Sequence, residues 1–143
     1  MKFWDSSAII PLVVEEASSA ALTQELHEDP HMLVWWATPV ECVSALARLE
    51  REGLLDAAGL SQTLERLVDL ELSWSEVQPI ERLRIHATRL LRVHPLRASD
   101  SLQLAAAIVA AEDQPRTLPF VTLDDRLALA AQREGFPVVD PGG

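Results

Sequence analysis

The chain alternates short strand-like segments with longer stretches whose apolar residues recur at helical spacing. The strand-like segments cover residues 2–5, 32–37, 72–77, 118–122 and 137–139. The segment at 32–37 is continuously apolar, as expected of a strand that is covered on both faces. Strands that alternate with helices form a parallel sheet with helices on both sides. The sequence therefore predicts an α/β fold, a three-layer α/β/α sandwich around a mainly parallel sheet of about five strands.

Helices are expected at 6–14, 18–28, 38–52, 56–70, 79–92, 99–111 and 124–134. Thr38 and Pro39 suit the N-cap and the first helical position of the third helix. The short link that begins at Gly53 joins this helix to the next one, which predicts an antiparallel helical hairpin at about 39–71. With 143 residues and no linker or repeat, the chain is expected to form a single domain, 1–143.

Four acidic residues stand where predicted strands end or helices begin: Asp5, Glu41, Asp100 and Asp124. Because the strands of a parallel sheet point the same way, Asp5, Glu41 and Asp124 are expected at one rim of the sheet. The helix that Asp100 opens is expected to pack nearby. Carboxylates this close require a shared proton or a cation, and hard divalent ions such as Mg²⁺ or Mn²⁺ prefer oxygen ligands. The set predicts a metal site.

Each acid taken singly also has a structural interpretation. Asp5 suits an N-cap, and Glu41 lies three residues after Thr38, the spacing of a capping box. Asp100 stands in a first helical turn, where a negative charge suits the helix dipole. Asp125 follows Thr122 at the spacing of another capping box. The metal-site hypothesis therefore rests on the four acids as a set.

The formal net charge is −10, from 22 acidic and 12 basic residues. This balance argues against a nucleic-acid binder that works by bulk positive charge, although metal ions bound to acids would reverse the local field. Eleven of the 12 bases are arginine, whose planar guanidinium suits phosphates. The single cysteine, Cys42, permits no internal disulfide, and no apolar run approaches the length of a membrane span. We therefore expect a cytoplasmic protein without a membrane segment.

Four blocks of sequence carry a family resemblance. They are Asp5-Ser6-Ser7-Ala8, Pro39-Val40-Glu41-Cys42-Val43-Ser44-Ala45-Leu46, Ser99-Asp100-Ser101-Leu102-Gln103-Leu104-Ala105-Ala106-Ala107 and Phe120-Val121-Thr122-Leu123-Asp124-Asp125-Arg126-Leu127. In this order and spacing they resemble the PIN-domain ribonucleases, in particular the VapC-type toxins of VapBC toxin–antitoxin pairs. The blocks span nearly the whole chain. They depart from the family pattern at Ser101, where Ala is more frequent, and at Gln103, where His is frequent.

The resemblance implies that Asp5, Glu41, Asp100 and Asp124 bind one or two Mg²⁺ or Mn²⁺ ions and hydrolyse RNA phosphodiester bonds. Ser7 and Thr122 match hydroxyl positions that support the first and last acids. The resemblance also implies a cytoplasmic toxin, often a homodimer, that is neutralised by a small VapB-like antitoxin. Apolar residues of the first three helices, such as Ile10, Leu22 and Val43, either form a groove for an antitoxin segment or belong to the core.

Five arginines fall within residues 82–97, and three of them, Arg89, Arg92 and Arg97, are candidates for contacting RNA. Arg97 is expected nearest the acids, because it lies three residues before Asp100. The alternative is a solvated helix face whose arginines pair with Glu76 and Glu81. The four histidines show no zinc-ligand spacing.

Two other functions remain as hypotheses. The first is a non-catalytic PIN-like module that binds protein or RNA, against which the complete set of four acids argues. The second is a phosphoryl-transfer receiver or phosphatase. It is disfavoured because such a site needs a lysine after a late strand, and the chain's one lysine is Lys2.

Overall fold

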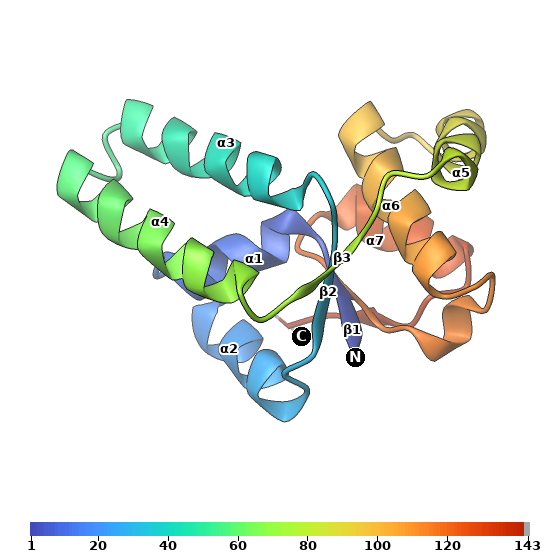
Figure 1. Cartoon of the computed structure of the whole chain (residues 1–143), viewed down its shortest axis with the longest axis horizontal. Helices are drawn as coiled ribbons and strands as arrows, with labels where there is room; N and C mark the ends of the chain where they lie inside the picture. The colour runs from blue at the N-terminus through green and yellow to red at the C-terminus, as the bar shows by residue number, and fades with distance from the viewer. Residues whose placement is uncertain (142–143) are drawn as a thin grey trace.

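The computed structural model describes residues 1–141. In chain order its elements are β1 (Lys2–Trp4), α1 (Ser6–Val13), α2 (Ser19–Glu28), β2 (Met32–Trp35), α3 (Thr38–Arg51), α4 (Ala57–Glu71), β3 (Ser75–Val77), α5 (Glu81–Val93), α6 (Ala98–Ala110), the short 3₁₀ turn η1 (Pro115–Thr117), β4 (Phe120–Val121), α7 (Asp125–Arg133) and β5 (Val138–Val139). Figure 1 shows the strands in the middle of the molecule with helices on both sides.

The five strands form one sheet in the order β3-β2-β1-β4-β5, and every neighbouring pair is parallel. This confirms the predicted α/β fold with a parallel sheet of about five strands. β1 is central: Phe3 lies opposite Leu33 of β2 on one side and Phe120 of β4 on the other. The residue that follows β1, Asp5, therefore lies in the middle of the rim where the strands end.

Two separate apolar cores lie on the two faces of the sheet. On one face, Phe3 and Phe120 pack with apolar residues of α5, α6 and α7. On the other face, Trp4 and Val121 pack with residues of α1, α2, α3 and α4. Successive side chains of a strand point to opposite faces, so each buried strand supplies both cores. The two cores make the fold a three-layer α/β/α arrangement. Figure 1 shows α1–α4 and α5–α7 on opposite sides of the sheet.

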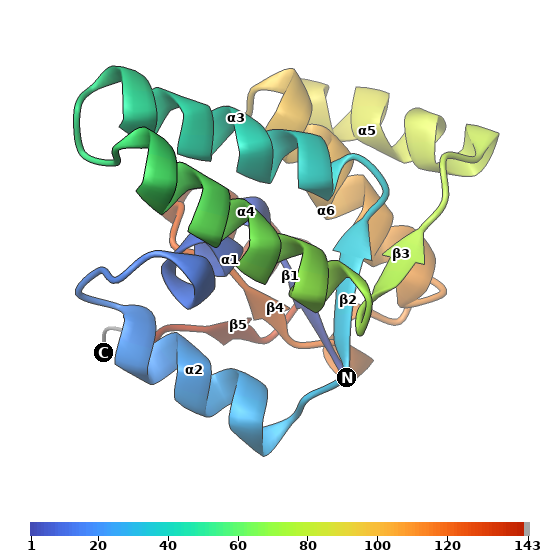
Figure 2. The same cartoon turned by 60° about the vertical axis from the view of Figure 1, so that its left-hand side comes forward.

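Helices α3 and α4 form the predicted hairpin. The turn between them includes Gly53 with φ of +79°, a left-handed conformation that glycine adopts without a Cβ clash. Figures 1 and 2 both show the two helices lying side by side and extending beyond the sheet. Of the two helices, α3 begins directly after β2 and so starts at the same rim of the sheet as Asp5.

Two local predictions about α3 are wrong. Thr38 is its first helical residue and not its N-cap, which is Ala37, and no side chain caps this end. The capping box between Thr38 and Glu41 is consequently absent. The cause is a tertiary contact, because the Thr38 hydroxyl accepts a hydrogen bond from Gln103 of α6 at 3.1 Å.

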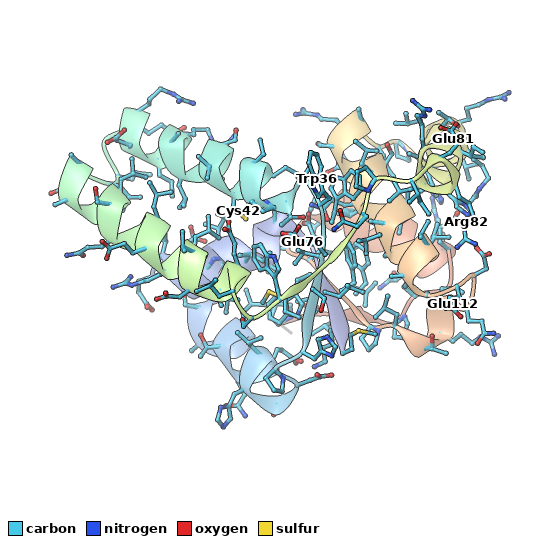
Figure 3. All side chains as sticks on the ribbon, in the orientation of Figure 1. Trp36, Cys42, Glu76, Glu81, Arg82 and Glu112 are labelled. Atoms are coloured by element: carbon cyan, nitrogen blue, oxygen red, sulfur yellow. The ribbon has the colours of Figure 1, made fainter. Side chains whose placement is uncertain are left out.

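Most of the apolar residues that were candidates for a groove belong to the core. Ile10 and Leu22 are buried, whereas Val43 is exposed on α3. Trp36, labelled in Figure 3, follows the end of β2 and is 51% exposed, whereas its neighbour Trp35 is buried. Among residues 1–141, no helix combines the length and the apolar character that crossing a bilayer requires.

Candidate active site

The centre of the candidate site is Asp5, whose backbone N–H donates to the carbonyl of Val121 at the end of β4. The chain leaves β1 into α1 on one face of the sheet and leaves β4 into α7 on the other. Neighbouring parallel strands whose helices depart to opposite faces leave a crevice at their carboxyl ends, which is the usual ligand site of such sheets. Asp5 and Asp124 follow these two strands and so flank the crevice.

Asp5 is 4% exposed and caps the N-terminus of α1. Its Oδ2 accepts hydrogen bonds from the hydroxyls of Ser7, at 2.5 Å, and Thr122, at 2.8 Å. The Ser7 hydroxyl in turn accepts a hydrogen bond from the backbone N–H of Leu123 at 2.9 Å, and the Thr122 hydroxyl accepts one from the backbone N–H of Asp124 at 3.0 Å. With each hydroxyl donating to Asp5 and accepting from the β4–α7 turn, the network ties the first acid to the chain segment that carries the last one.

Glu41 reaches the same place from the first turn of α3. Its Oε1 lies 3.2 Å from the Ser6 hydroxyl, which also lies 3.4 Å from Oδ1 of Asp5. Its Oε2 accepts a hydrogen bond from Nε2 of Gln103 at 3.0 Å. A single hydroxyl thus stands between the first two carboxylates. The partners of Glu41 are on α1 and α6, and none is at the end of its own helix.

Asp100 and Asp124 each have a structural role at a helix start. Oδ2 of Asp100 lies 3.4 Å from the backbone nitrogen of Arg97, a capping contact at the start of α6. Oδ1 of Asp124 accepts the N–H of Leu127 at 3.0 Å and caps α7. The predicted capping box with Asp125 is wrong, because Asp124 is the cap and the Thr122 hydroxyl faces Asp5. In both acids a second carboxylate oxygen is free of these capping bonds.

The crevice widens into a pocket of about 870 Å³ between α1, α3 and the N-termini of α6 and α7. Glu41, Asp100 and Asp124 line it, and Asp5 lies buried beneath Ser6 and Ser7 of its wall. The other polar side chains of the wall are Ser44, Arg48, Arg97, Ser99, Asp125 and Arg126. Segments that are far apart in the sequence therefore bring the four predicted acids to one place.

The arginines of the pocket differ from those expected. Of the three candidates for contacting RNA, Arg97 lines the pocket, whereas Arg89 forms an ion pair with Glu134 at 2.7 Å on the α5–α7 side. Arg92, also on α5, is exposed and does not line it. Figure 3 shows the start of α5, marked by Glu81 and Arg82, on the opposite side of the molecule from the hairpin.

Two further arginines of the pocket, Arg48 and Arg126, were not singled out from the sequence. Arg48 follows Glu41 by seven residues, or two helical turns, so a helical plot of α3 places both on one face. Arg126 follows Asp124 by two residues, in the first turn of α7. For Arg48 the available signal was an arginine at helical spacing from an acid.

The electrostatics of the site disfavour ionised carboxylates when no cation is present. Burial, more than any other cause, raises the pKa of Asp5, against the hydrogen bonds from Ser7 and Thr122, and the charge of Asp100 raises it further. Burial and then the charge of Asp5 raise the pKa of Glu41 to about 7. Burial and then Asp124 raise the pKa of Asp100. The acids of the site repel one another and are poorly solvated, which is the condition that a bound cation relieves.

A hard divalent ion fits this donor set in chemistry, since all the candidate ligands are carboxylate oxygens. Among residues 1–141, however, no three or more Asp, Glu, His or Cys side chains are already arranged to hold a metal ion. Holding an ion would therefore require the carboxylates to draw together from the positions described above. Cys42, next to Glu41, is buried in the core and does not line the pocket.

Comparisons with known proteins give solved structures of the same fold, among them the following two. A chain of a toxin–antitoxin complex from Klebsiella pneumoniae aligns with a TM-score of 0.64 and 16% identity, covering 99% of this chain and 98% of that chain. A chain of the FitAcB crystal structure from Neisseria gonorrhoeae aligns with a TM-score of 0.67, again at 16% identity and over 99% and 98% of the two chains. No protein-family model and no curated protein sequence matches the chain. The alignments establish a shared fold over 99% of this chain.

Proposed function

We propose that the protein is a Mg²⁺- or Mn²⁺-dependent endoribonuclease that hydrolyses RNA phosphodiester bonds. The observation that carries the proposal is the meeting of Asp5, Glu41, Asp100 and Asp124 at one pocket, in the crevice between β1 and β4. Four segments of the chain contribute one acid each. Helix capping explains Asp100 and Asp124 individually, but it explains neither Glu41 nor the burial of Asp5.

These four residues would hold the ion through their carboxylate oxygens. A bound Mg²⁺ supplies an activated water near neutral pH and neutralises charge on the phosphate. Ser7 and Thr122 hold the Asp5 carboxylate in one orientation, because both hydroxyls donate hydrogen bonds to its Oδ2. The Ser6 hydroxyl lies between Asp5 and Glu41 and can donate its proton to either carboxylate.

The three arginines of the pocket, Arg48, Arg97 and Arg126, support an anionic substrate. A chain with a formal net charge of −10 does not attract RNA through its overall field. These arginines compensate for the unfavourable net charge at the crevice itself, because one guanidinium group can donate two hydrogen bonds to a phosphate. Arg97 remains a candidate for contacting RNA, because it lines the pocket. Arg89 forms an ion pair with Glu134, and Arg92 lies outside the pocket.

The fold shared with a chain of a toxin–antitoxin complex supports a biological role of the same kind. In this role the protein acts in the cytoplasm as a VapC-type toxin, is neutralised by a small VapB-like antitoxin, and forms a homodimer. Co-expression tests the pairing: growth arrest by this chain should be relieved by a short protein encoded beside it.

Metal-dependent cleavage of labelled RNA tests the enzymatic proposal. The wild-type chain should cleave with Mg²⁺ or Mn²⁺ and stop when EDTA is added. Asp5→Asn and Asp100→Asn should each lose at least about 100-fold in rate, because each removes a charged ligand. Asp69→Asn, an exposed acid on α4, is the matched control and should cleave normally. Undiminished cleavage by both site variants would refute the proposal.

One observation favours a second candidate, a PIN-like module that binds RNA or protein without cleaving it. No metal-holding group is preformed in residues 1–141, and the carboxylates of Asp100 and Asp124 serve as caps. Calorimetry with Mn²⁺ separates the two candidates. Heat that disappears in Asp5→Asn supports the nuclease, and no heat at millimolar Mn²⁺ supports the module.

A further inference from the structure

Gln103 is a buried amide side chain at the candidate site. It lies on α6 among Leu104, Ala105 and Ala106, and its exposed fraction is 0%. Its Nε2 donates to Oγ1 of Thr38 at 3.1 Å and to Oε2 of Glu41 at 3.0 Å. Its carbonyl oxygen, Oε1, has no hydrogen-bond partner among the described residues.

An unpartnered buried carbonyl is unfavourable, so the amide orientation needs a cause. Turning the amide over would place its carbonyl oxygen against the ionised carboxylate of Glu41, the form that binds a cation, acceptor against acceptor. The NH₂ group therefore faces Glu41, and the carbonyl is left without a donor. An apolar side chain of the same length would fill this part of α6 without an unpartnered group, so packing alone does not account for glutamine here.

The contact also fixes Glu41. Its Oε2 is held by Gln103 from α6 and its Oε1 lies beside Ser6 of α1. Two donors on different helices restrict a side chain that otherwise turns freely about its own bonds. Through Gln103 the carboxylate is linked to α6, the helix whose first turn carries Asp100.

We propose that Gln103 is a positioning residue for the divalent cation, which holds the Glu41 carboxylate in the orientation that binds the ion. Gln103 acts through Glu41 and does not touch the ion itself. Hydrogen-bond donors behind metal ligands typically change metal affinity 10- to 100-fold. This inference rests on the proposed metal-dependent function and assigns a role to a residue outside the four acids.

The test is the affinity of the full chain for Mn²⁺, measured by calorimetry without RNA. Gln103→Met keeps the length of the side chain but removes both donated hydrogen bonds, and should weaken Mn²⁺ binding at least about tenfold. Gln62→Met, the same substitution at an exposed position of α4, is the matched control and should bind Mn²⁺ as the wild type does. Circular dichroism of each variant confirms that it is folded.

A double-mutant cycle separates positioning from general damage. In a Glu41→Gln background, adding Gln103→Met should weaken Mn²⁺ binding by less than about twofold, because the carboxylate on which Gln103 acts is already gone. An additional tenfold loss in that background overturns the inference. If Gln103→Met does not fold, Gln103→Asn is measured in its place, since the amide then falls one methylene short of Glu41 and should show the same loss.

The outcomes distinguish this inference from the function on which it rests. A wild-type chain that binds Mn²⁺ and a Gln103→Met chain that binds it equally well overturn the positioning role alone. A wild-type chain that binds no Mn²⁺ at millimolar concentration overturns both proposals.

Discussion

Replacing Glu41 by glutamine should change how the stability of the metal-free protein depends on pH. Burial and the neighbouring charge of Asp5 raise the pKa of Glu41 from 4.5 to about 7. A carboxyl group with a raised pKa binds its proton more tightly in the folded state than in the unfolded state. The stabilisation that this tighter proton binding gives the folded state is fully present below about pH 4.5 and is lost as the pH rises through about 7. The wild type should therefore lose stability between pH 5 and pH 8.

The separation between the folded and unfolded pKa values sets an upper bound of about 3 kcal/mol on this loss. Because Glu41 lines an open pocket and is partly solvated, screening reduces the expected effect to about 2 kcal/mol. Glu41→Gln has no proton to lose at this position. Its free energy of unfolding should fall by about 2 kcal/mol less than that of the wild type across the same range.

Denaturation by urea, followed by tryptophan fluorescence at several pH values with EDTA present, measures the difference. Glu50→Gln, an exposed glutamate on the same helix, is the control and should follow the wild-type curve. Parallel curves for the wild type and Glu41→Gln from pH 5 to pH 8 would show that neither burial nor the charge of Asp5 raises the pKa of Glu41, and the electrostatic description of the site would be wrong.

Three further predictions concern the same pocket. Thr122→Val removes one donor to Asp5 and one acceptor for the β4–α7 turn; it should cost about 1–3 kcal/mol in urea denaturation, and no loss would mean that the network is unimportant for folding. Arg48→Ala should raise the KM for RNA about 5- to 10-fold and lower the slope of log affinity against log salt by the equivalent of about one phosphate contact. Arg51→Ala on the same helix should change neither quantity, and equal effects of the two substitutions would remove Arg48 from the proposed substrate site. Mg²⁺ should raise the melting temperature more at pH 8 than at pH 5.5, because ligand carboxylates must be deprotonated, and a shift independent of pH would argue against carboxylate ligands.

The order of the elements and the parallel sheet could be predicted because they depend on local patterns. The buried runs around Phe3, Leu33 and Phe120 have the continuous apolar character that a doubly covered strand requires. The convergence of the acids could be anticipated for a related reason. Parallel strands end at one rim, so an acid directly after a strand, such as Asp5, has its position fixed by topology.

Contacts between distant segments could not be predicted. Thr38 stands in a sequence that is typical of an N-cap, but its hydroxyl accepts a hydrogen bond from Gln103, 65 residues later in the chain. Arg89 appeared available for RNA, yet Glu134, 45 residues later, pairs with it. In both cases local propensity is overridden by a partner that only the packed fold supplies.

The measurement that tests the metal site most directly is anomalous scattering from a crystal of the wild-type chain grown with Mn²⁺. We expect a peak in the pocket within coordination distance of Asp5 and of at least one of Glu41 and Asp100, with these carboxylates closer together than in the structure described above. Crystals in millimolar Mn²⁺ that show no peak in this pocket would contradict the claim that these acids share a cation.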